Sequence, residues 1–445
     1  MSFIIDKQTL NDLGIFSRNK EISVYDIFNS TKTRGGAEIL KEMFYNPLDN
    51  YSLISRRSVI IDYYRRSKAT FPFSGSWFDA AESYISDTDS RKRQELITQV
   101  GAVQNKLKKL IGVSAEYSQA VAGISAIVEI VNTLDRFTAL MAKDAAMLDA
   151  SDELREIREI FDSGPLTTVT ALGNGAAIKP EQIADLDAIF HGKEEKALRK
   201  MLDYIYQIDV YISIAQVAEE RGFVQAEVYP ASENLLEFKG LYHPALKKPV
   251  ANDLTVDKNS NIIFLTGANM AGKSTFMKSF GIALFLAHVG VPVPATSMKF
   301  SVRDGMYTTI NLPDNLSRGY SHFYAEVRRL KQVALSVNIH RNMIIIFDEL
   351  FRGTNVKDAY DATVAVTEAF AVIKESIFLI STHIIEAGEE LGKLCNNIAF
   401  VYLPTKMNGS IPEYTYRLTR GITEDRHGMM IVRNEGILDI LGYQE

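Results

Sequence analysis

Ten residues in the carboxy-terminal half of the chain have the composition of a phosphate-binding loop. They are Thr266-Gly267-Ala268-Asn269-Met270-Ala271-Gly272-Lys273-Ser274-Thr275, a complete Gly-x-x-x-x-Gly-Lys-Ser pattern. Glycines let the backbone approach phosphate oxygens, with successive N–H groups pointing inward, and a following helix adds partial positive charge. In such a loop Lys273 reaches the β- and γ-phosphates, and the Ser274 hydroxyl can ligate Mg²⁺. The pattern predicts that Gly267–Thr275 bind a nucleoside triphosphate.

The residues on either side of this loop fit the same interpretation. An apolar run of β-forming residues, Ile262-Ile263-Phe264-Leu265, precedes it. After it, apolar and aromatic residues recur at helical spacing on one face, at Phe276, Phe280, Leu284 and His288. A strand, a glycine-rich turn and a helix are the context in which this motif binds phosphate.

A second strand pattern ends in two acidic residues. Met343–Phe347 is a continuous apolar run, as expected of a parallel strand buried on both faces, and Asp348 and Glu349 follow it. Adjacent carboxylates at the end of a buried strand need a cation to compensate them. In a phosphate-loop ATPase, Asp348 would hold the Mg²⁺ shell and Glu349 would accept a proton from the water that attacks the γ-phosphate. The acidic pair therefore predicts hydrolysis of the bound nucleotide.

Further segments resemble the MutS family of DNA mismatch repair ATPases. Asp348–Asn355, with Asp358 following, is similar to that family's acidic strand end and the loop after it, and the pair Asn269-Met270 is typical of its phosphate loop. The other similar segments are Thr31–Gly36, Asn46–Leu48, Leu241–Pro244, Val250–Leu254, Asp314–Leu316, Ser321–Glu326, Ser381–His383, Gly421-Ile422 and His427–Met429. The resemblance covers nearly the whole chain and is most specific in residues 230–430.

The resemblance implies a multidomain protein with two kinds of architecture. An all-α lever-and-core domain would be followed by an α/β ABC-type P-loop ATPase domain with a mostly parallel sheet. The patterns agree, because helical stripes fill residues 1–225 and strands begin after Arg221-Gly222. We therefore expect domains at 1–225 and 226–445, with the most linker-like stretch at Ser163–Gly175. The expected strands are 224–228, 235–238, 262–265, 344–347, 377–380, 398–402 and 414–418, with an antiparallel edge.

Two residues take catalytic roles from the resemblance. Ser321, leading a helix, would offer its hydroxyl, its N–H and the helix dipole to the γ-phosphate held by a second chain, so that a homodimer forms two composite ATP sites. His383, which follows the apolar strand Ile377–Ile380, would lie beside the phosphate. The alternatives are that Ser321 only caps its helix and that His383 is a loop residue without a role.

The chain also departs from the family's pattern. MutS proteins read a mismatch with a Phe-x-Glu motif in an amino-terminal domain, but here the helical core pattern begins by about residue 20, and the only Phe-x-Glu is Phe347–Glu349. We therefore expect the mismatch-reading, connector and clamp domains, and most of the carboxy-terminal dimerisation helices, to be missing. Pro249 stands where the family places an aromatic residue to stack on adenine; Tyr242 or His243 are the candidates to replace it.

Composition limits the classes of protein that remain. No apolar run approaches 18 residues, the amino terminus has no apolar signal core, and the single cysteine, Cys395, excludes a disulfide framework, so we expect a cytoplasmic protein with no membrane partner. The net charge of −6 is unlike that of a dedicated nucleic-acid binder. Basic clusters are nevertheless present in the amino-terminal half, at Arg56-Arg57, Arg65–Lys68, Arg91–Arg93 and Lys106–Lys109.

The sequence leads to one expected function and two alternatives. The expectation is a dimeric ATPase, with ATP and Mg²⁺ as cofactors, that binds DNA through its helical domain and recognises DNA structure such as branches and junctions. The first alternative is an ATP-driven conformational machine that acts on a ribosome or another RNA assembly. The second is a scaffold whose ATP site controls dimerisation with negligible turnover.

Overall fold

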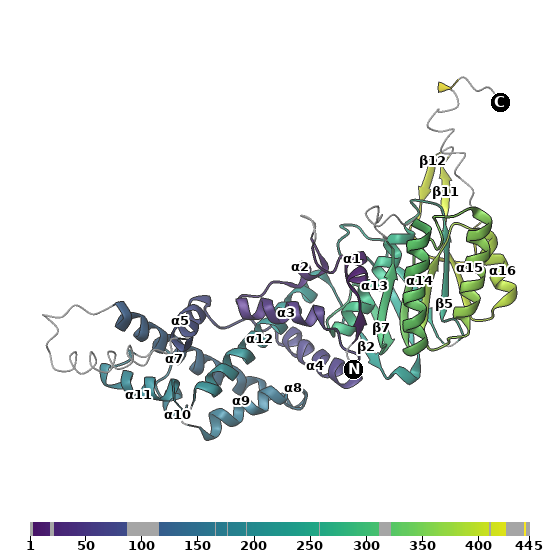
Figure 1. Cartoon of the computed structure of the whole chain (residues 1–445). Helices are drawn as coiled ribbons and strands as arrows, with labels where there is room; N and C mark the ends of the chain where they lie inside the picture. Colours follow the sequence, from purple (N-terminus) through teal and green to yellow (C-terminus); the bar gives the residue numbers. More distant parts are fainter. Residues whose placement is uncertain are drawn as a thin grey trace. The chain divides into compact units, whose positions relative to one another are not determined.

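The computed structural model describes ten stretches of the chain and divides it into two compact units (Figure 1). The described residues are 3–17, 22–86, 115–164, 166–175, 177–192, 194–257, 259–310, 322–408, 411–423 and 440–441. The unit called here the sheet unit consists of Met1–Phe28, Met43–Ser58 and Ala218–Glu445. The unit called the helical unit consists of Asn29–Glu42 and Val59–Val217.

Helices account for all the regular structure described in the helical unit. They are α3 (Arg34–Tyr45), α4 (Tyr51–Ser67), α5 (Gly75–Ser86), α7 (Ala115–Met141), α8 (Ala145–Ala150), α9 (Asp152–Ser163), α10 (Thr167–Thr170), α11 (Pro180–Phe190) and α12 (Glu195–Arg221), where α3, α4 and α12 continue into the sheet unit. The helical spacing of Leu198, Leu202, Ile205 and Ile212 predicts an apolar stripe on α12; Leu198, Ile205 and Ile212 are buried, and Leu202 is half-buried. The stretch Ser163–Gly175 contains α10 and lies inside this unit, so it does not connect the two units.

A buried carboxylate fixes the start of α3 within the helical unit. Asp209, on α12, is 1% exposed and accepts hydrogen bonds from the backbone N–H groups of Lys32 and Thr33 and from the Thr33 hydroxyl. A Cβ atom at Gly36 would lie 2.6 Å from Asp209 Oδ2. One at Gly35 would lie 2.5 Å from the Tyr206 ring. The two glycines of the Thr31–Gly36 segment thus allow the close approach of α3 to α12.

The sheet unit is built around a seven-stranded sheet with the order β1-β7-β8-β9-β5-β10-β13. The strands are β1 (Ile4–Ile5), β7 (Gly305–Thr309), β8 (Met343–Phe347), β9 (Ile377–Ser381), β5 (Ile262–Gly267), β10 (Ile398–Leu403) and β13 (Thr419–Arg420). All neighbours are parallel except β10 and β13, which pair antiparallel. The prediction of a mostly parallel sheet with an antiparallel edge is confirmed.

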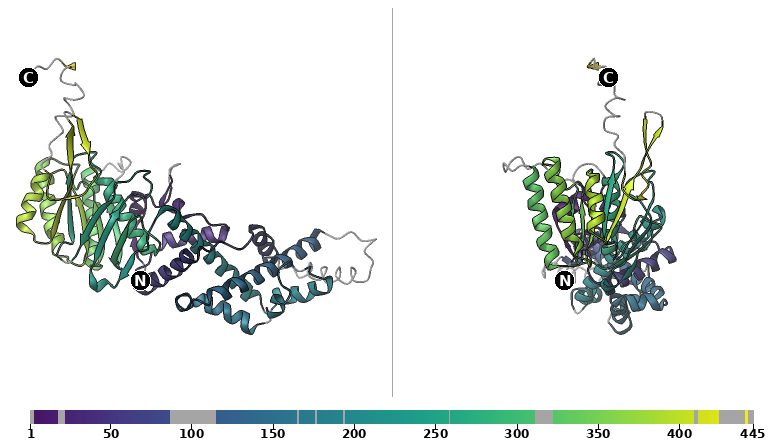
Figure 2. Two further views of the ribbon diagram at one scale, coloured as in Figure 1. Left: turned by 180° about the vertical axis from the view of Figure 1, so that it is seen from behind. Right: turned by 90° about the vertical axis from the view of Figure 1, so that its right-hand side faces the viewer.

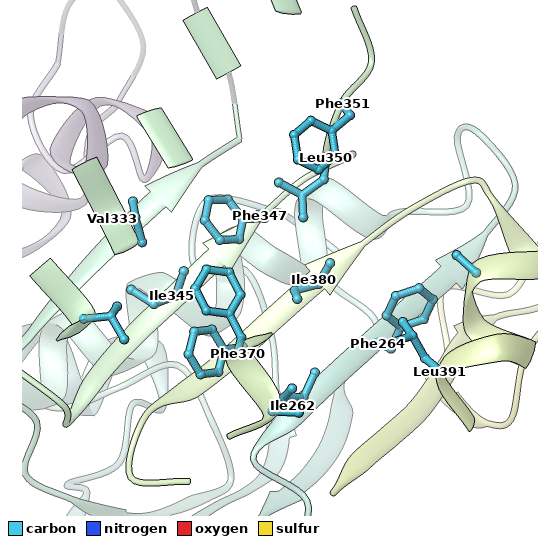
Figure 3. Close-up of a cluster of buried hydrophobic side chains, with 14 of the residues drawn as sticks. Ile262, Phe264, Val333, Ile345, Phe347, Leu350, Phe351, Phe370, Ile380 and Leu391 are labelled. Carbon is cyan, nitrogen blue, oxygen red and sulfur yellow. The ribbon is translucent and has the colours of Figure 1, made fainter. Parts of the chain in front are cut away.

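Helices cover both faces of this sheet. The helices α14 (His322–Ile339), α15 (Val356–Ala371) and α16 (Ile385–Leu394) share one buried apolar cluster with Ile262, Phe264, Ile345, Phe347 and Ile380 of the strands (Figure 3). Alternate residues of a strand face opposite sides, so Ile346 points to the other face, where it lies against Gly281 of α13 (Lys273–Val289). Burial on both faces explains why these strands are continuous apolar runs.

Two smaller sheets complete the strands of this unit. The four-stranded sheet has the order β2-β6-β3-β4, from β2 (Glu227–Tyr229), β6 (Ser297–Ser301), β3 (Leu236–Leu241) and β4 (Asn252–Val256). The strands β11 (Thr405–Asn408) and β12 (Ile411–Tyr414) pair as a hairpin that extends past the end of β10 (Figure 2). The strand expected at residues 414–418 is wrong, because β12 ends at Tyr414 and Tyr416 has a positive φ of 54° that a strand does not allow.

The amino-terminal segment completes the edge of the main sheet, although residues 1–225 were expected to be helical. β1 pairs parallel with β7, and Asp12, at the end of α1 (Lys7–Asp12), accepts hydrogen bonds from the Thr308 hydroxyl at 2.7 Å and from Ile310 N at 2.9 Å. Asp6, before α1, forms an ion pair with Arg329 of α14. The physical reason is that the polar groups on the outer edge of β7 need partners, which this segment supplies.

No helix in the described stretches combines the length and the apolar content needed to cross a bilayer. The remaining short elements are α2 (Val24–Phe28) and a 3₁₀ turn, Ala231–Glu233.

Candidate nucleotide-binding site

The predicted phosphate loop connects β5 to α13. Gly267 and Gly272 have φ angles of 146° and 101°, which only glycine adopts without strain. At Gly272 a Cβ atom would also lie 2.9 Å from the Tyr416 ring. Met270 has a φ of 70° and is 77% exposed, so its side chain contributes little to the loop's packing. The loop thus has the conformation that its glycines predict, and it leads directly into the first turn of a 17-residue helix.

Lys273 lies inside this loop. Its Nζ donates hydrogen bonds to the carbonyl oxygens of Gly267 at 2.8 Å and Ala268 at 3.2 Å, and the residue is 5% exposed. Burial lowers the pKa of the Lys273 ammonium, while the carboxylates of Glu349 and Asp348 act in the opposite direction. The ammonium is therefore in the centre of the loop and close to both predicted acids.

Two hydroxyl groups hold the Asp348 carboxylate at the end of β8. Ser274 Oγ, in the first turn of α13, donates a hydrogen bond of 2.5 Å to Oδ2, and Ser381 Oγ, at the end of β9, donates one of 2.5 Å to Oδ1. The predicted metal ligands Ser274 and Asp348 are thus in direct contact across 74 residues of sequence.

These residues fit a magnesium ion that binds together with phosphate. Mg²⁺ prefers oxygen ligands and is bound in nucleotide sites by one or two protein oxygens plus phosphate oxygens and water. The Ser274 hydroxyl and the Asp348 carboxylate are such a pair. Among the described residues, no three His, Cys, Asp or Glu side chains form a cluster that could hold a metal by itself. A metal held by this pair would complete its coordination with water and with oxygens of the nucleotide.

Glu349 lies between two cations. Its Oε1 is 3.9 Å from Lys273 Nζ, and its Oε2 is 2.8 Å from Arg352 Nε. The backbone has an unusual φ of 53°, and the N–H donates to both the carbonyl oxygen of Ser381, at 3.1 Å, and the Ser381 hydroxyl, at 3.2 Å. The side chain is 14% exposed, so it faces the solvent-accessible side of the loop while remaining held in place.

The loop after Glu349 packs against the start of α14. Phe351 has a positive φ of 65°, is 4% exposed and lies in the apolar cluster with its ring centroid 6.1 Å from that of Phe323. A Cβ atom at Gly353 would be 2.5 Å from Phe323 N, so only glycine allows this approach. Ser321 itself lies outside the described residues, and its predicted role is not addressed by these contacts.

The predicted histidine lies at the end of the neighbouring strand. β9 stands between β8, which carries the acidic pair, and β5, which leads to the phosphate loop. His383 follows β9 two residues after Ser381, and its side chain is exposed. Backbone bonds fix the turn before it, because Thr382 N donates to Leu265 O at 3.2 Å. The structure therefore places His383 at the edge of the sheet where the other predicted residues meet.

A cavity of about 290 Å³ lies beside the loop, on the side of Gly272. It is lined by Leu241, His243, Leu246, Lys248, Pro249, Val250, Asn252, Gly272, Thr275, Phe276, Ser279, Leu403 and Tyr416. Of the two aromatic candidates from the sequence, His243 lines the cavity and Tyr242 does not. Burial, with a smaller contribution from Lys278, lowers the pKa of His243, so its ring is neutral at pH 7.

Two residues at this site were missed from the sequence. Tyr416 lines the cavity from the segment after β12, where Asn252 Nδ2 donates to its carbonyl oxygen at 3.1 Å and Asn252 Oδ1 accepts from Leu418 N at 2.6 Å. No sequence pattern indicates this, because the contact joins residues 164 apart. Ser381 belongs to a segment that was singled out only for His383; a hydroxyl at the end of a strand beside the acidic strand was the available signal.

Comparison with known proteins gives the family. Residues 263–440 match the family model described as MutS domain V. The MutS protein homolog 4 of Mus musculus is 30% identical over 241 residues, which are 52% of this chain and 24% of that protein. The DNA mismatch repair protein MutS of Persephonella marina is 30% identical over 242 residues, 54% of this chain and 27% of that protein. The DNA mismatch repair protein MutS of Fusobacterium nucleatum is 27% identical over 275 residues, which are 60% of this chain and 30% of that protein.

The family-model match covers most of the site described above. The phosphate loop, both acids and His383 all lie within residues 263–440. The chain spans less than a third of the length of these curated relatives. Residues 263–440 carry a MutS domain V, and by this domain and its relatives that part of the chain belongs to the MutS family.

Proposed function

We propose that this chain is a Mg²⁺-dependent ATPase that uses ATP binding and hydrolysis to switch its affinity for DNA. The observation that carries the ATPase proposal is the contact between Ser274 and Asp348. Their oxygens lie 2.5 Å apart, although one belongs to the phosphate loop and the other to the end of β8. This arrangement unites the metal-binding hydroxyl and the metal-binding carboxylate that phosphoryl transfer to water requires.

Each residue has a defined task in this proposal. The N–H groups of Ala268–Thr275 and the start of α13 bind the phosphates, and Lys273 exchanges its carbonyl partners for the β- and γ-phosphate oxygens. Ser274 and Asp348 hold Mg²⁺, which neutralises charge on the phosphates. Glu349 accepts a proton from the attacking water, and His383 helps to orient the γ-phosphate.

The cavity beside Gly272 takes the adenine in this proposal. Its volume of about 290 Å³ and its mixture of apolar and polar lining suit a purine ring. Tyr416 supplies the aromatic surface that Pro249 does not. Asn252 holds this segment through hydrogen bonds to the Tyr416 carbonyl oxygen and the Leu418 N–H. His243, being neutral, adds a second flat ring without placing a charge beside the base.

The DNA-binding part of the proposal is supported by the relatives, two of which are named as DNA mismatch repair proteins. We propose that the helical unit contacts DNA and that the chain recognises branched or otherwise altered duplexes. Of the basic clusters noted in the sequence, Arg65 and Arg66 form ion pairs with Asp62, at 3.1 and 2.8 Å. The clusters at Arg91–Arg93 and Lys106–Lys109 lie outside the described residues.

We also propose that two chains form the complete ATPase, with Ser321 of each completing the site of the other. The support for this is the resemblance of Ser321–Glu326 to the serine-bearing segment of the MutS family, within the region that matches MutS domain V. A dimer that depends on bound ATP would follow, since the γ-phosphate would join the two chains.

The test of the ATPase proposal is the substitution Lys273→Ala. ATP binding, measured by calorimetry with Mg²⁺ present, is expected to be abolished while the circular dichroism spectrum is retained, because Lys273 supplies the one ammonium inside the loop. Lys393→Ala, on the exposed end of α16, is the matched control and should bind ATP as the parent does. An unchanged ATP affinity of Lys273→Ala would refute the site. Steady-state phosphate release by the parent chain distinguishes an ATPase from a scaffold with negligible turnover.

A further inference from the structure

We infer that Ser381 is a positioning residue that orients both acids of the proposed ATPase site and thereby sets its affinity for the divalent cation. Its hydroxyl donates a hydrogen bond of 2.5 Å to Asp348 Oδ1 and accepts one of 3.2 Å from the N–H of Glu349. The carbonyl oxygen of the same residue accepts from that N–H at 3.1 Å. One fully buried side chain thus contacts both members of the acidic pair.

The register of the sheet explains why position 381 can do this. Phe347 of β8 pairs with Ile380 of β9, so the next residues, Asp348 directly after β8 and Ser381 at the end of β9, lie next to each other. On its other side Ser381 pairs with Leu265 of β5, two residues before Gly267. The hydroxyl therefore sits on the strand between the acidic pair and the phosphate loop, and a side chain without a donor there would leave Asp348 Oδ1 with one bond fewer.

The two hydroxyls act on opposite oxygens of Asp348. Ser274 Oγ bonds Oδ2, which is the oxygen on the side of the phosphate loop. Ser381 Oγ bonds Oδ1 and so fixes the plane of the carboxylate whether or not Ser274 keeps its own bond. A carboxylate whose orientation is fixed in advance loses less freedom when it binds a cation, and partners of this kind commonly change metal affinity by 10- to 100-fold.

Ser381 also supports the strained backbone of Glu349. A φ of 53° is unfavourable for a residue other than glycine, and the two acceptors on Ser381 hold the N–H of Glu349 in that conformation. We therefore expect the loss of this hydroxyl to affect both metal binding and hydrolysis. Loss of the hydroxyl weakens metal binding through Asp348 and slows hydrolysis through Glu349, while the loop amides and Lys273 still bind nucleotide.

The experiment compares Ser381→Ala and Ser381→Thr with the parent chain and rests on the ATP site proposed above. Binding of Mn²⁺ in the presence of a non-hydrolysable ATP analogue is followed by electron paramagnetic resonance, and analogue binding without a divalent cation by calorimetry. In Ser381→Ala we expect the Mn²⁺ dissociation constant to rise about 10-fold and kcat to fall by a similar factor. Analogue affinity without the cation should change less than about twofold. Ser381→Thr, which keeps the hydroxyl, should restore the Mn²⁺ affinity to within about threefold of the parent.

Thr363→Val is the matched control. It removes a buried hydroxyl of α15 that has no hydrogen-bond partner among the described residues, and it should leave the Mn²⁺ affinity unchanged. The inference is overturned if Ser381→Ala binds Mn²⁺ as tightly as the parent. It is also overturned if Ser381→Thr folds but does not recover the Mn²⁺ affinity. Should Ser381→Ala not fold, Ser381→Cys, similar in shape but a poor donor, carries the same expectation. A parent chain that binds no analogue would instead refute the proposed ATP site, so the two failures are distinguishable.

Discussion

Glu349 is the residue whose surroundings bear most directly on turnover. Lys273 Nζ faces Oε1 at 3.9 Å, and Arg352 Nε contacts Oε2 at 2.8 Å, so both oxygens of the carboxylate face a cation. Arg352 is 61% exposed, and ion pairs open to solvent contribute little free energy. In the proposed mechanism, Lys273 would turn to the phosphates when nucleotide binds. Glu349 Oε1 would then be the oxygen available to accept a proton from water.

The first prediction follows from this arrangement. Glu349→Gln keeps the size and shape of the side chain but removes the base, so the hydrolysis rate should fall by about 10²-fold or more while ATP still binds. Single-turnover hydrolysis and calorimetry measure the two quantities. Glu390→Gln, an exposed acid of α16 paired with Lys393, is the control and should hydrolyse ATP normally. Hydrolysis at the parental rate in Glu349→Gln would show that another group is the base.

Tyr416 gives the second prediction at this scale. Tyr416→Ala should weaken ATP binding about 10-fold, since stacking on a base is worth roughly 1–3 kcal/mol. Tyr416→Phe should bind ATP nearly as well as the parent, because the ring remains. Inorganic tripolyphosphate has no base, so its affinity serves as the internal control and should be equal in all three chains. If Tyr416→Ala weakens tripolyphosphate and ATP equally, the residue acts on the loop through Gly272 and not on adenine.

The residues that sequence spacing predicted and those it missed differ in how their contacts are encoded. The sequence indicated the phosphate loop and the acidic pair because each is a short contiguous motif of residue types suited to phosphate or metal binding. These motifs are Gly267–Thr275 and Asp348-Glu349. Ser381 and Tyr416 act through contacts with residues 33 and 164 positions away, at Asp348 and Asn252, which no local pattern reveals. Of the two adenine candidates from the sequence, Tyr242 does not line the cavity and His243 does, which the adjacent positions alone do not reveal.

At the scale of elements, the loop between β8 and α15 stores backbone strain. Glu349 and Phe351 both have positive φ angles, although neither is glycine, and the buried ring of Phe351 holds the loop on the start of α14. Such conformations persist where packing over-determines them, and they are concentrated at functional sites. A loop anchored by one aromatic ring therefore connects the proposed base to the segment that contains Ser321.

The third prediction tests that anchor with two substitutions. Phe351→Ala removes the buried ring and should lower the free energy of unfolding by about 3 kcal/mol. Phe351→Gly removes the same ring but tolerates a φ of 65°, so it should be more stable than Phe351→Ala by ~1 kcal/mol. Urea denaturation of both variants gives the comparison. An alanine variant more stable than the glycine variant would mean that the loop does not keep a left-handed residue at 351.

The elements themselves were predictable where they are long or buried on both faces. Ile262–Leu265, Ile344–Phe347 and Ile377–Ile380 lie within β5, β8 and β9, because a continuous apolar run has few alternatives in a parallel sheet. The two-residue strand β1 was not predicted, since a strand of that length has no periodicity to read. Its place at the edge of the sheet depends on β7 and on Asp6 and Asp12, which are distant in the sequence.

At the scale of the whole molecule, the charge of the chain restricts how it can bind DNA. The net charge is −6, and the described basic pair Arg65 and Arg66 is neutralised in part by Asp62. Any DNA affinity must come from a limited number of Lys and Arg contacts to phosphates. Such contacts carry no sequence information and weaken steeply as salt increases.

The last prediction concerns the kind of DNA that this 445-residue chain prefers. The one Phe-x-Glu of the sequence is Phe347–Glu349, and there Phe347 is 1% exposed in the core of the sheet, so its ring is not free to insert beside a mispair. We therefore expect equal affinity for matched and G·T-mismatched duplexes, and tighter binding of a four-way junction, whose shape suits a dimer. Titrations of the three DNAs at two salt concentrations measure this, with a structured RNA of equal length as the control for a preference for RNA. A mismatch preference of tenfold, ~1.4 kcal/mol, would require a mismatch-reading surface elsewhere in the chain.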